Sequence, residues 1–266
     1  LRSSNKLNLV NPYEDAIAPE LLNFEMSAEF NNNTGRPSII FDFMVKDEGA
    51  GYERAYVRIK DPNNLNNDRW IYSDEDILKP GIQFVLDLTQ EYTSGQFEIS
   101  FFDLYDSVGN KSQWSSAELL GLAYDSFINV YFKPEGAGDD YVITASSQDD
   151  WLIGGDSKDV LDAGEGSDVI YAGNGDDIVF AGMGEDLIIG GSGLGEDNYD
   201  GGEGIDTIKY TSAEAGIIVD LEMGYASSAL PQEDSLIGYD SISNVENIIS
   251  GYYDDLITGN DSNNDL

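Results

Sequence analysis

The chain has 266 residues, enough for two domains of ordinary size, and 41% of them are hydrophobic. Its charge is strongly negative, because 51 acidic side chains outnumber 13 basic ones and give a formal net charge of −38. This balance argues against nucleic-acid binding and docking to anionic lipid, which need a basic surface, and it favours cations as partners. The absence of Cys and His excludes thiol nucleophiles, Cys/His zinc sites and histidine-based catalysis. No run of about 18 apolar residues occurs, so we expect no membrane insertion.

Short β-strands are predicted throughout residues 1–133. Apolar residues occupy alternate positions, as at Phe24, Met26, Ala28 and Phe30, and turn signals rich in Gly, Pro and Asn separate the runs. Strands at this spacing predict an antiparallel β-sandwich. The predicted strands are Leu21–Phe30, Ile39–Val45, Arg54–Ile59, Trp70–Tyr72, Ile82–Leu88, Phe97–Leu104 and Ile128–Phe132.

Two sets of side chains in residues 1–133 are candidate sites, and each has a simpler interpretation. Asp47, Glu48, Asp103 and Asp106 lie in or beside predicted loops and could hold a calcium ion, but such residues more often form turns. Four aromatic residues could form a sugar-binding platform, but aromatics in a sandwich more often pack in the core or across strands. These aromatic residues are Trp70, Tyr72, Tyr92 and Trp114.

From residue 134 onward the acidic charge is concentrated and periodic. This half holds 30 acidic side chains and two basic ones, Lys158 and Lys209, which gives a net charge of −28. Aspartates recur every nine residues, each with an aliphatic residue two positions later and most with a glycine four positions earlier. Disordered acidic tails lack such spacing, so the period indicates a repeat structure. The aspartates of the uninterrupted run are Asp150, Asp159, Asp168, Asp177 and Asp186.

The period extends beyond this run with small irregularities. A two-residue insertion precedes Asp197, Asp206 then resumes the spacing, and Asp255 belongs to a later unit. Upstream, Asp140 fits the same template one residue out of phase. These aspartates, those of the run and the turn glycines are the candidate metal ligands. The glycines are Gly155, Gly164, Gly166, Gly173, Gly175, Gly182 and Gly184.

Each nine-residue unit is predicted to form one turn followed by one short strand. Two units make one coil of about 18 residues, so Asp150, Asp168 and Asp186 should stack along one edge and Asp159 and Asp177 along the other. Carboxylates stacked at a strand spacing of about 4.7–4.9 Å need a cation between them. Calcium takes about six to eight oxygens from carboxylates and backbone carbonyls, so several calcium ions are expected. The simpler alternative is a solenoid whose aspartates merely form turns.

The repeat follows the pattern G-G-x-G-x-D-x-U-x and resembles the RTX (haemolysin-type calcium-binding) repeat family. The resemblance covers roughly residues 135–266, with repeats over 135–209, a variant segment over 210–250 and repeats that resume over 251–266. It implies a C-terminal parallel β-roll, or β-solenoid, of calcium-binding nonapeptide repeats. The expected fold is therefore all-β, with an N-terminal antiparallel β-sandwich before the roll.

Residues 1–133 also resemble immunoglobulin-like modules of bacterial surface and secreted proteins, in the segments AIAPELLNFEMS and DLYDSVGNKS. Two domains are therefore predicted, an immunoglobulin-like sandwich over 1–133 and an RTX β-roll over 134–266. This layout implies a fragment of a large bacterial RTX adhesin, secreted or held at the cell surface. We expect a non-enzymatic, extracellular calcium-binding module that folds on calcium outside the cell and serves adhesion or binds an extracellular carbohydrate or protein. The alternative is the non-catalytic secretion and folding region of an RTX exoenzyme of protease, lipase or alginate epimerase type.

Overall fold

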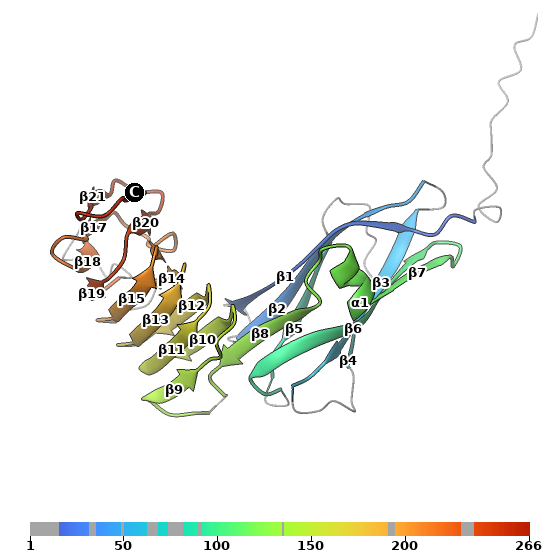
Figure 1. The fold of residues 1–266 in the computed structure, drawn as a ribbon, viewed down its shortest axis with the longest axis horizontal. Coiled ribbons are helices and arrows are strands. Elements are labelled where there is room, and N and C mark those ends of the chain that lie inside the picture. Colours follow the sequence, from blue (N-terminus) through green and yellow to red (C-terminus); the bar gives the residue numbers. More distant parts are fainter. Residues whose placement is uncertain are drawn as a thin grey trace, which may run out of the picture. The chain divides into compact units, whose positions relative to one another are not determined.

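The computed structural model of the protein describes residues 16–31, 36–48, 51–62, 69–73, 82–89, 92–134, 136–190, 195–229 and 237–266. Figure 1 labels most of the strands, and the one short helix found among these residues, along the chain. Within the chain, two compact units form. The first comprises Leu1–Ser27, Ile40–Leu86 and Glu98–Phe127, and the second comprises Ala28–Ile39, Asp87–Phe97 and Ile128–Leu266.

The first part of the chain is antiparallel β-structure, as predicted. One sheet has the strand order β1-β2-β5, and elsewhere β3 pairs antiparallel with β4 and β6, while β6 pairs antiparallel with β7. The seven predicted strands agree with β1 to β6 and β8 to within three residues at each end. The elements are β1 (Glu20–Asn31), β2 (Arg36–Lys46), β3 (Tyr52–Lys60), β4 (Arg69–Ser73), β5 (Ile82–Asp87), β6 (Gly95–Asp106), β7 (Lys111–Ser115), α1 (Ser116–Gly121) and β8 (Phe127–Phe132).

Two of these elements, β7 and α1, are additions to the sequence-based prediction. The β7 segment reads KSQWS and has no buried residue, so it lacks the alternation by which a strand is recognised. The helix has only six residues, and Leu119 is its buried one. Its start is fixed locally, because the Glu118 carboxylate accepts hydrogen bonds from the Ser115 backbone N–H at 2.8 Å and the Ser115 hydroxyl at 2.7 Å.

Aromatic side chains form much of the core of the first unit. The Phe102 ring lies 5.2 Å from the Phe24 ring and 5.0 Å from the Phe43 ring, and Phe43 also contacts Phe84 at 5.0 Å between centroids. Exposure of all four side chains is 4% or less. This apolar packing accounts for the alternation in the sequence and depends on no ion.

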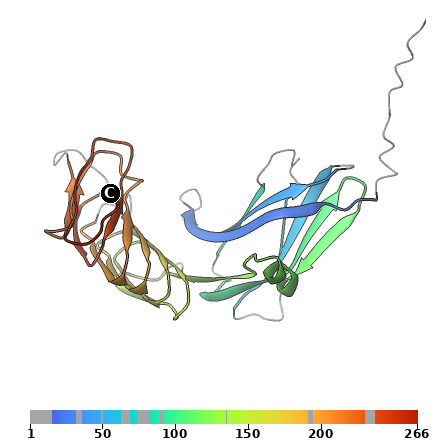
Figure 2. The ribbon, with the colours of Figure 1, turned by 45° about the horizontal axis from the view of Figure 1, so that its top comes forward.

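Most of the remaining strands form the parallel solenoid, whose coils lie side by side from β9 to β15 (Figure 1) and are seen from a second direction in Figure 2. Strands alternate between two sheets, one running β8-β10-β12-β14-β16-β20 and the other β9-β11-β13-β15-β19. About four turns span residues 130–209, so the predicted all-β fold with a parallel C-terminal solenoid is confirmed. The strands are β9 (Tyr141–Thr144), β10 (Trp151–Asp156), β11 (Asp159–Glu165), β12 (Val169–Asn174), β13 (Ile178–Gly184), β14 (Leu187–Ile189), β15 (Asn198–Gly204), β16 (Thr207–Lys209), β17 (Ile217–Asp220), β18 (Tyr225–Ser228), β19 (Tyr239–Ser243), β20 (Asn247–Ile249) and β21 (Leu256–Thr258).

The register places the periodic aliphatic residues inside the solenoid. Leu152 pairs with Ile170 in one sheet and Leu161 with Val179 in the other, an offset of one full coil, and all four are fully buried. The variant segment predicted over 210–250 contributes to both sheets. Strand β18 pairs antiparallel with both β17 and β19, and β19 pairs parallel with β15. Strand β20 pairs parallel with β16. This segment therefore continues the solenoid rather than interrupting it.

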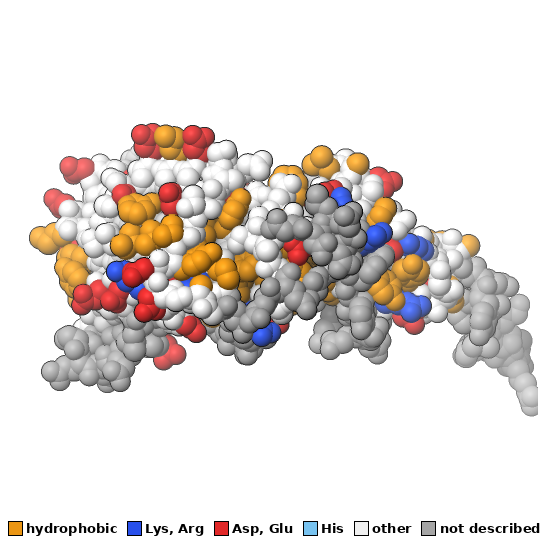
Figure 3. Space-filling view, turned by 90° about the horizontal axis from the view of Figure 1, so that it is seen from below, with side chains coloured by type: hydrophobic (Ala, Val, Ile, Leu, Met, Phe, Trp, Pro, Cys, Tyr) orange, Lys and Arg blue, Asp and Glu red, His pale blue; other side chains and the backbone are white. Residues whose placement is uncertain are grey.

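The surface of the solenoid is mixed in character. Figure 3 shows apolar side chains gathered beside acidic ones on one face. Among exposed hydrophobic residues of this region, Val142 is 57% and Phe180 is 46% exposed. In the described part of the chain, no helix has the length and apolarity needed to cross a membrane.

Candidate metal sites

The periodic aspartates stand at the starts of successive strands and form two columns. The Asp150 column comprises Asp150, Asp168, Asp186 and Asp206, and the Asp159 column comprises Asp159, Asp177, Asp197 and Asp240. In each column, one carboxylate oxygen accepts a hydrogen bond from the backbone N–H of the aspartate one coil earlier. Asp168 Oδ1 accepts from Asp150 N, and Asp177 Oδ1 from Asp159 N, both at 2.8 Å. The stacking predicted along two edges is thus present.

The second carboxylate oxygen of most column members has no partner. Six such oxygens are buried without a hydrogen bond, and each of the aspartates that carry them is 2% exposed or less. A buried and unpaired carboxylate oxygen is strongly unfavourable unless a cation or a donor meets it. These atoms are Asp150 Oδ1 and the Oδ2 atoms of Asp159, Asp168, Asp177, Asp186 and Asp206.

Glycines bring the main chain close to these unpaired oxygens. A Cβ atom added at Gly201 would lie 2.8 Å from Asp206 Oδ2 and would overlap the Asn244 carbonyl oxygen. At Gly154 it would lie 3.3 Å from Asp159 Oδ2. The seven predicted turn glycines all have φ between 101° and 141°, a region that side chains rarely adopt. These are Gly155, Gly164, Gly166, Gly173, Gly175, Gly182 and Gly184.

Burial makes the charged form of these carboxylates costly. It raises the pKa of Asp168 and Asp206 to about 7 and that of Asp177 to about 8, and the neighbouring column carboxylates add to the effect. Burial also raises the pKa of Asp150 and Asp186, against the hydrogen bonds that they accept. A cation placed beside the unpaired oxygens would remove this penalty.

The donor set fits calcium. It consists of hard oxygens only, from carboxylates and from backbone carbonyls of the glycine turns, and such sets suit calcium better than softer metals. Among the described residues, no three acidic side chains converge to hold a metal ion by themselves. The backbone carbonyls must therefore supply much of any coordination shell, which is the role that the glycines permit.

Two predicted ligands differ from the others. Asp140 lies outside both columns, has a φ of 57°, and pairs at the surface with Lys158 at 3.3 Å. Asp255 Oδ1 accepts the Ile217 backbone N–H at 2.9 Å, so it repeats the column contact one coil further on. No carboxylate oxygen of Asp140 or Asp255 is among the buried oxygens without a hydrogen bond.

The structure also reveals two acidic residues that the nine-residue period missed, Asp240 within the Asp159 column and Glu246 beyond the end of the Asp150 column. Asp240 Oδ1 accepts the Asp197 backbone N–H at 3.3 Å, and Glu246 Oε2 accepts that of Asp206 at 3.0 Å. Each is followed two residues later by an aliphatic residue, Ile242 or Ile248, as in the regular units. An acidic residue followed at that distance by an inward aliphatic is therefore the more general signal.

The acidic candidates of the first half have partners within the chain, although two of them keep one buried oxygen without a hydrogen bond. Asp106 accepts the backbone N–H groups of Val108 at 3.0 Å and Asn110 at 2.7 Å, as a turn former does. Asp103 Oδ2 pairs with Lys111 at 2.8 Å, and Glu48 pairs with Lys46. Asp103 Oδ1 and Asp47 Oδ2 are each buried without a hydrogen bond.

The aromatic candidates do not assemble into a platform among the described side chains. Tyr92 is 9% exposed and lies 6.2 Å from the Phe97 ring, so it is a core residue. Trp114 packs on Phe102 at 6.0 Å. The side chains of Trp70 and Tyr72 lie outside the described residues.

Comparison with known families agrees with this geometry. Residues 136–170 and 163–194 match the RTX calcium-binding nonapeptide repeat, in four copies. No curated protein matches the chain. The matched residues supply the first coils of the parallel solenoid, three of the four members of the Asp150 column and two of the four members of the Asp159 column. This part of the chain is a calcium-binding RTX repeat module.

Proposed function

We propose that calcium ions bind along the two columns, each held by unpaired aspartate oxygens and by backbone carbonyls of the glycine turns. The observation that carries this proposal is the row of six buried carboxylate oxygens without a partner. Within each column these oxygens lie one coil apart, and all except that of Asp206 belong to the segment that matches calcium-binding repeats. A row of such oxygens is a ligand set that a divalent cation completes.

Calcium and folding are coupled in this proposal. Without ions the folded solenoid holds many close, buried carboxylates, and the segment from residue 134 onward carries a net charge of −28. Ions that bind only the folded form stabilise it by mass action at every site. Calcium modules outside cells bind with dissociation constants of about 10⁻⁴–10⁻³ M, so the solenoid would fold outside the cell and remain unfolded at cytosolic calcium.

The chain is further proposed to act as a non-catalytic, secreted or surface-exposed module in adhesion, with a carbohydrate or protein ligand. Exposed aromatic side chains near the end of the solenoid support a sugar ligand. Tyr225 and Tyr239 stack at 5.6 Å with a 6° angle between rings, Tyr239 is 57% exposed and Tyr252 is 98% exposed. Flat, solvent-facing aromatic rings with a polar edge suit such contacts.

The test is a calcium titration of the full chain after removal of bound ions, followed by far-UV circular dichroism. A cooperative gain of β signal at about 10⁻⁴–10⁻³ M calcium, absent with magnesium at equal concentration, is expected. Replacing Asp168 and Asp177 together by Asn should raise the calcium midpoint at least about tenfold. Asn retains an oxygen for the column hydrogen bond but lacks the second carboxylate oxygen.

A matched control removes the same charge elsewhere in the solenoid. Asp162→Asn combined with Glu203→Gln changes two exposed acidic side chains on β11 and β15 and should leave the midpoint unchanged. A complete β signal in chelator would contradict calcium-coupled folding. Saturation well below micromolar calcium would contradict folding restricted to the outside of the cell.

A further inference from the structure

The two columns differ in how their second carboxylate oxygens are satisfied. All four members of the Asp150 column have one buried oxygen without a partner. In the Asp159 column only Asp159 and Asp177 do. The later members, Asp197 and Asp240, are equally buried, at 7% and 2% exposure, yet both of their oxygens accept hydrogen bonds.

A tyrosine hydroxyl supplies the missing donor at Asp197. Tyr199 occupies the inward aliphatic position of its coil, in register with Val179 before it and Ile242 after it. Its ring is fully buried, and its hydroxyl donates to Asp197 Oδ2 at 2.7 Å. A tyrosine is longer than the aliphatic residues of other coils, so its polar end reaches back to the carboxylate two residues earlier.

A second tyrosine does the same at Asp240. Tyr210 follows β16, and its hydroxyl donates to Asp240 Oδ2 at 2.9 Å across the interior of the solenoid. Its ring is also fully buried and lies against Gly190, where a Cβ atom would come within 2.8 Å of Tyr210 Cε1. Hydrogen bonds to ionised acceptors are about twice as strong as neutral ones, and these two are shielded from water.

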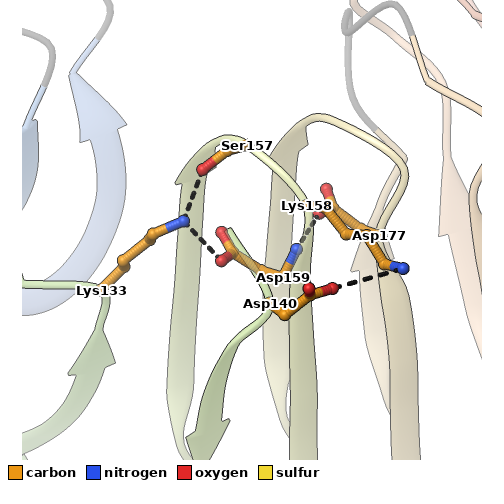
Figure 4. Close-up of polar contacts among 6 residues, drawn as sticks. All are labelled: Lys133, Asp140, Ser157, Lys158, Asp159 and Asp177. Atoms are coloured by element: carbon orange, nitrogen blue, oxygen red, sulfur yellow. Dashed lines mark hydrogen bonds and ion pairs between the residues drawn. The ribbon is translucent and has the colours of Figure 1, made fainter. Parts of the chain in front are cut away.

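The other end of the Asp159 column meets a lysine. Lys133 Nζ lies 2.6 Å from Asp159 Oδ1 and 2.6 Å from Ser157 Oγ, with its side chain 9% exposed and that of Asp159 fully buried (Figure 4). The nearby pair of Lys158 with Asp140 is different, because those side chains are 46% and 71% exposed. An ammonium group held at this depth supplies positive charge directly to the column.

We infer that the chain closes the Asp159 column with its own donors, so that calcium loads the two columns unequally. Lys133 meets the first carboxylate, and Tyr199 and Tyr210 occupy the oxygens of Asp197 and Asp240 that a cation would otherwise take. Calcium in this column is confined to Asp159 Oδ2 and Asp177 Oδ2, whereas the Asp150 column takes ions along all four members. This inference rests on the proposed binding of calcium by the columns.

The test counts calcium ions on the full chain by native mass spectrometry, with wild type compared to Tyr199→Phe combined with Tyr210→Phe. Phenylalanine keeps both rings but leaves Asp197 and Asp240 with unpaired oxygens like those of the other members. The variant is expected to bind at least one more calcium ion than wild type and to unfold at a lower temperature in limiting calcium. Tyr171→Phe is the matched control, because this tyrosine stacks on Trp151 and contacts neither column.

Substitution of Lys133 provides an independent test, which applies even if the double tyrosine variant fails to fold. Lys133→Met removes the ammonium and keeps the apolar stem, so the melting temperature in limiting calcium should fall and saturating calcium should restore it. Lys158→Met removes a solvent-exposed ion pair, which contributes little, and should behave as wild type. An unchanged ion count in the tyrosine variant would overturn the closure at Asp197 and Asp240. Equal behaviour of the two lysine variants would overturn the closure at Asp159.

These outcomes are distinct from failure of the proposed function. Should wild type bind no calcium at all, the proposed function falls and this inference with it. Should wild type bind calcium while the tyrosine variant shows the same ion count and the same melting temperature in limiting calcium, only the unequal loading is wrong.

Discussion

Two buried aspartates, Asp106 of the first unit and Asp177 of the solenoid, differ in how their oxygens are satisfied. In the first unit, Asp106 is fully buried, and the backbone N–H groups of Val108 and Asn110 and the Asn110 side-chain amide all donate to it. In the solenoid, Asp177 is 1% exposed, yet only one of its oxygens has a donor. A carboxylate enclosed by its own turn needs nothing from outside, whereas one enclosed by a neighbouring coil still needs a cation.

Removing calcium should produce the largest difference between the solenoid and the first unit, in the hydrogen-exchange protection of their backbone amides. In chelator, backbone amides of β11 and β13 should lose their protection from hydrogen exchange, because the carboxylates beside them are left buried and uncompensated. Amides of β3 and β6 should stay protected, since their aromatic core needs no ion. Hydrogen exchange with mass spectrometry, with and without calcium, measures both at once. Equal loss of protection in the two regions would refute the distinction.

The close approach of adjacent coils gives the next largest effect. Gly173 has a φ of 106°, and a Cβ atom there would overlap the main chain of Gly155 one coil earlier. Gly173→Ala should therefore lower the free energy of unfolding in saturating calcium by at least about 3 kcal/mol, since strain and overlap add. Gly138→Ala, at a glycine with nothing within 4 Å of its added Cβ, should have little effect. Denaturant unfolding of both variants in calcium provides the comparison.

Core truncations sharpen the contrast further. Ile170 and Phe102 are both fully buried, one in the solenoid and one in the first unit. Each truncation to Ala should cost about 2–5 kcal/mol. The loss in Ile170→Ala should appear only in the calcium-dependent transition, and the loss in Phe102→Ala should persist in chelator. Thermal unfolding followed by calorimetry resolves the two transitions, and a single transition shifted equally by both variants would contradict the expectation.

The last expected effect concerns pH in calcium-free buffer. Because burial raises the pKa of Asp168 to about 7 and of Asp177 to about 8, the folded solenoid holds more protons than the unfolded chain between about pH 4 and 8. Its stability should therefore be greatest below pH 4 and fall as pH rises through 8. Circular dichroism between pH 5 and 9 measures this fall. In saturating calcium the trend should disappear, because ions replace the protons.

Much of the solenoid follows from the sequence because its geometry is local and periodic. A turn glycine, an aspartate and an inward aliphatic residue recur within nine residues, and the repeat alone predicts that Asp150 and Asp168 stack. The strands of the first half follow from alternation, except for β7, whose polar sequence carries no such signal. The division of the chain into two units within several of these strands has no local signature.

The donors that close the Asp159 column could not be predicted, because they depend on contacts between distant residues. Tyr210 meets Asp240 across 30 residues, and Lys133 meets Asp159 across 26. Periodicity places Tyr199 at an inward position, but it does not indicate which atom the hydroxyl contacts. Asp240 itself lies off the nine-residue spacing, so its membership of a column becomes visible only in three dimensions.

The direction of the column hydrogen bonds has a mechanical consequence. In every link the backbone N–H belongs to the earlier coil and the carboxylate to the later one, as from Asp150 to Asp168 and from Asp168 to Asp186. In these links a coil does not supply the acceptor for the amide of its own aspartate, so each coil depends on the coil that follows it. Such an array behaves as a one-dimensional chain of coupled units. Tension applied along it should therefore unravel the solenoid coil by coil, each release exposing the amide of the coil before.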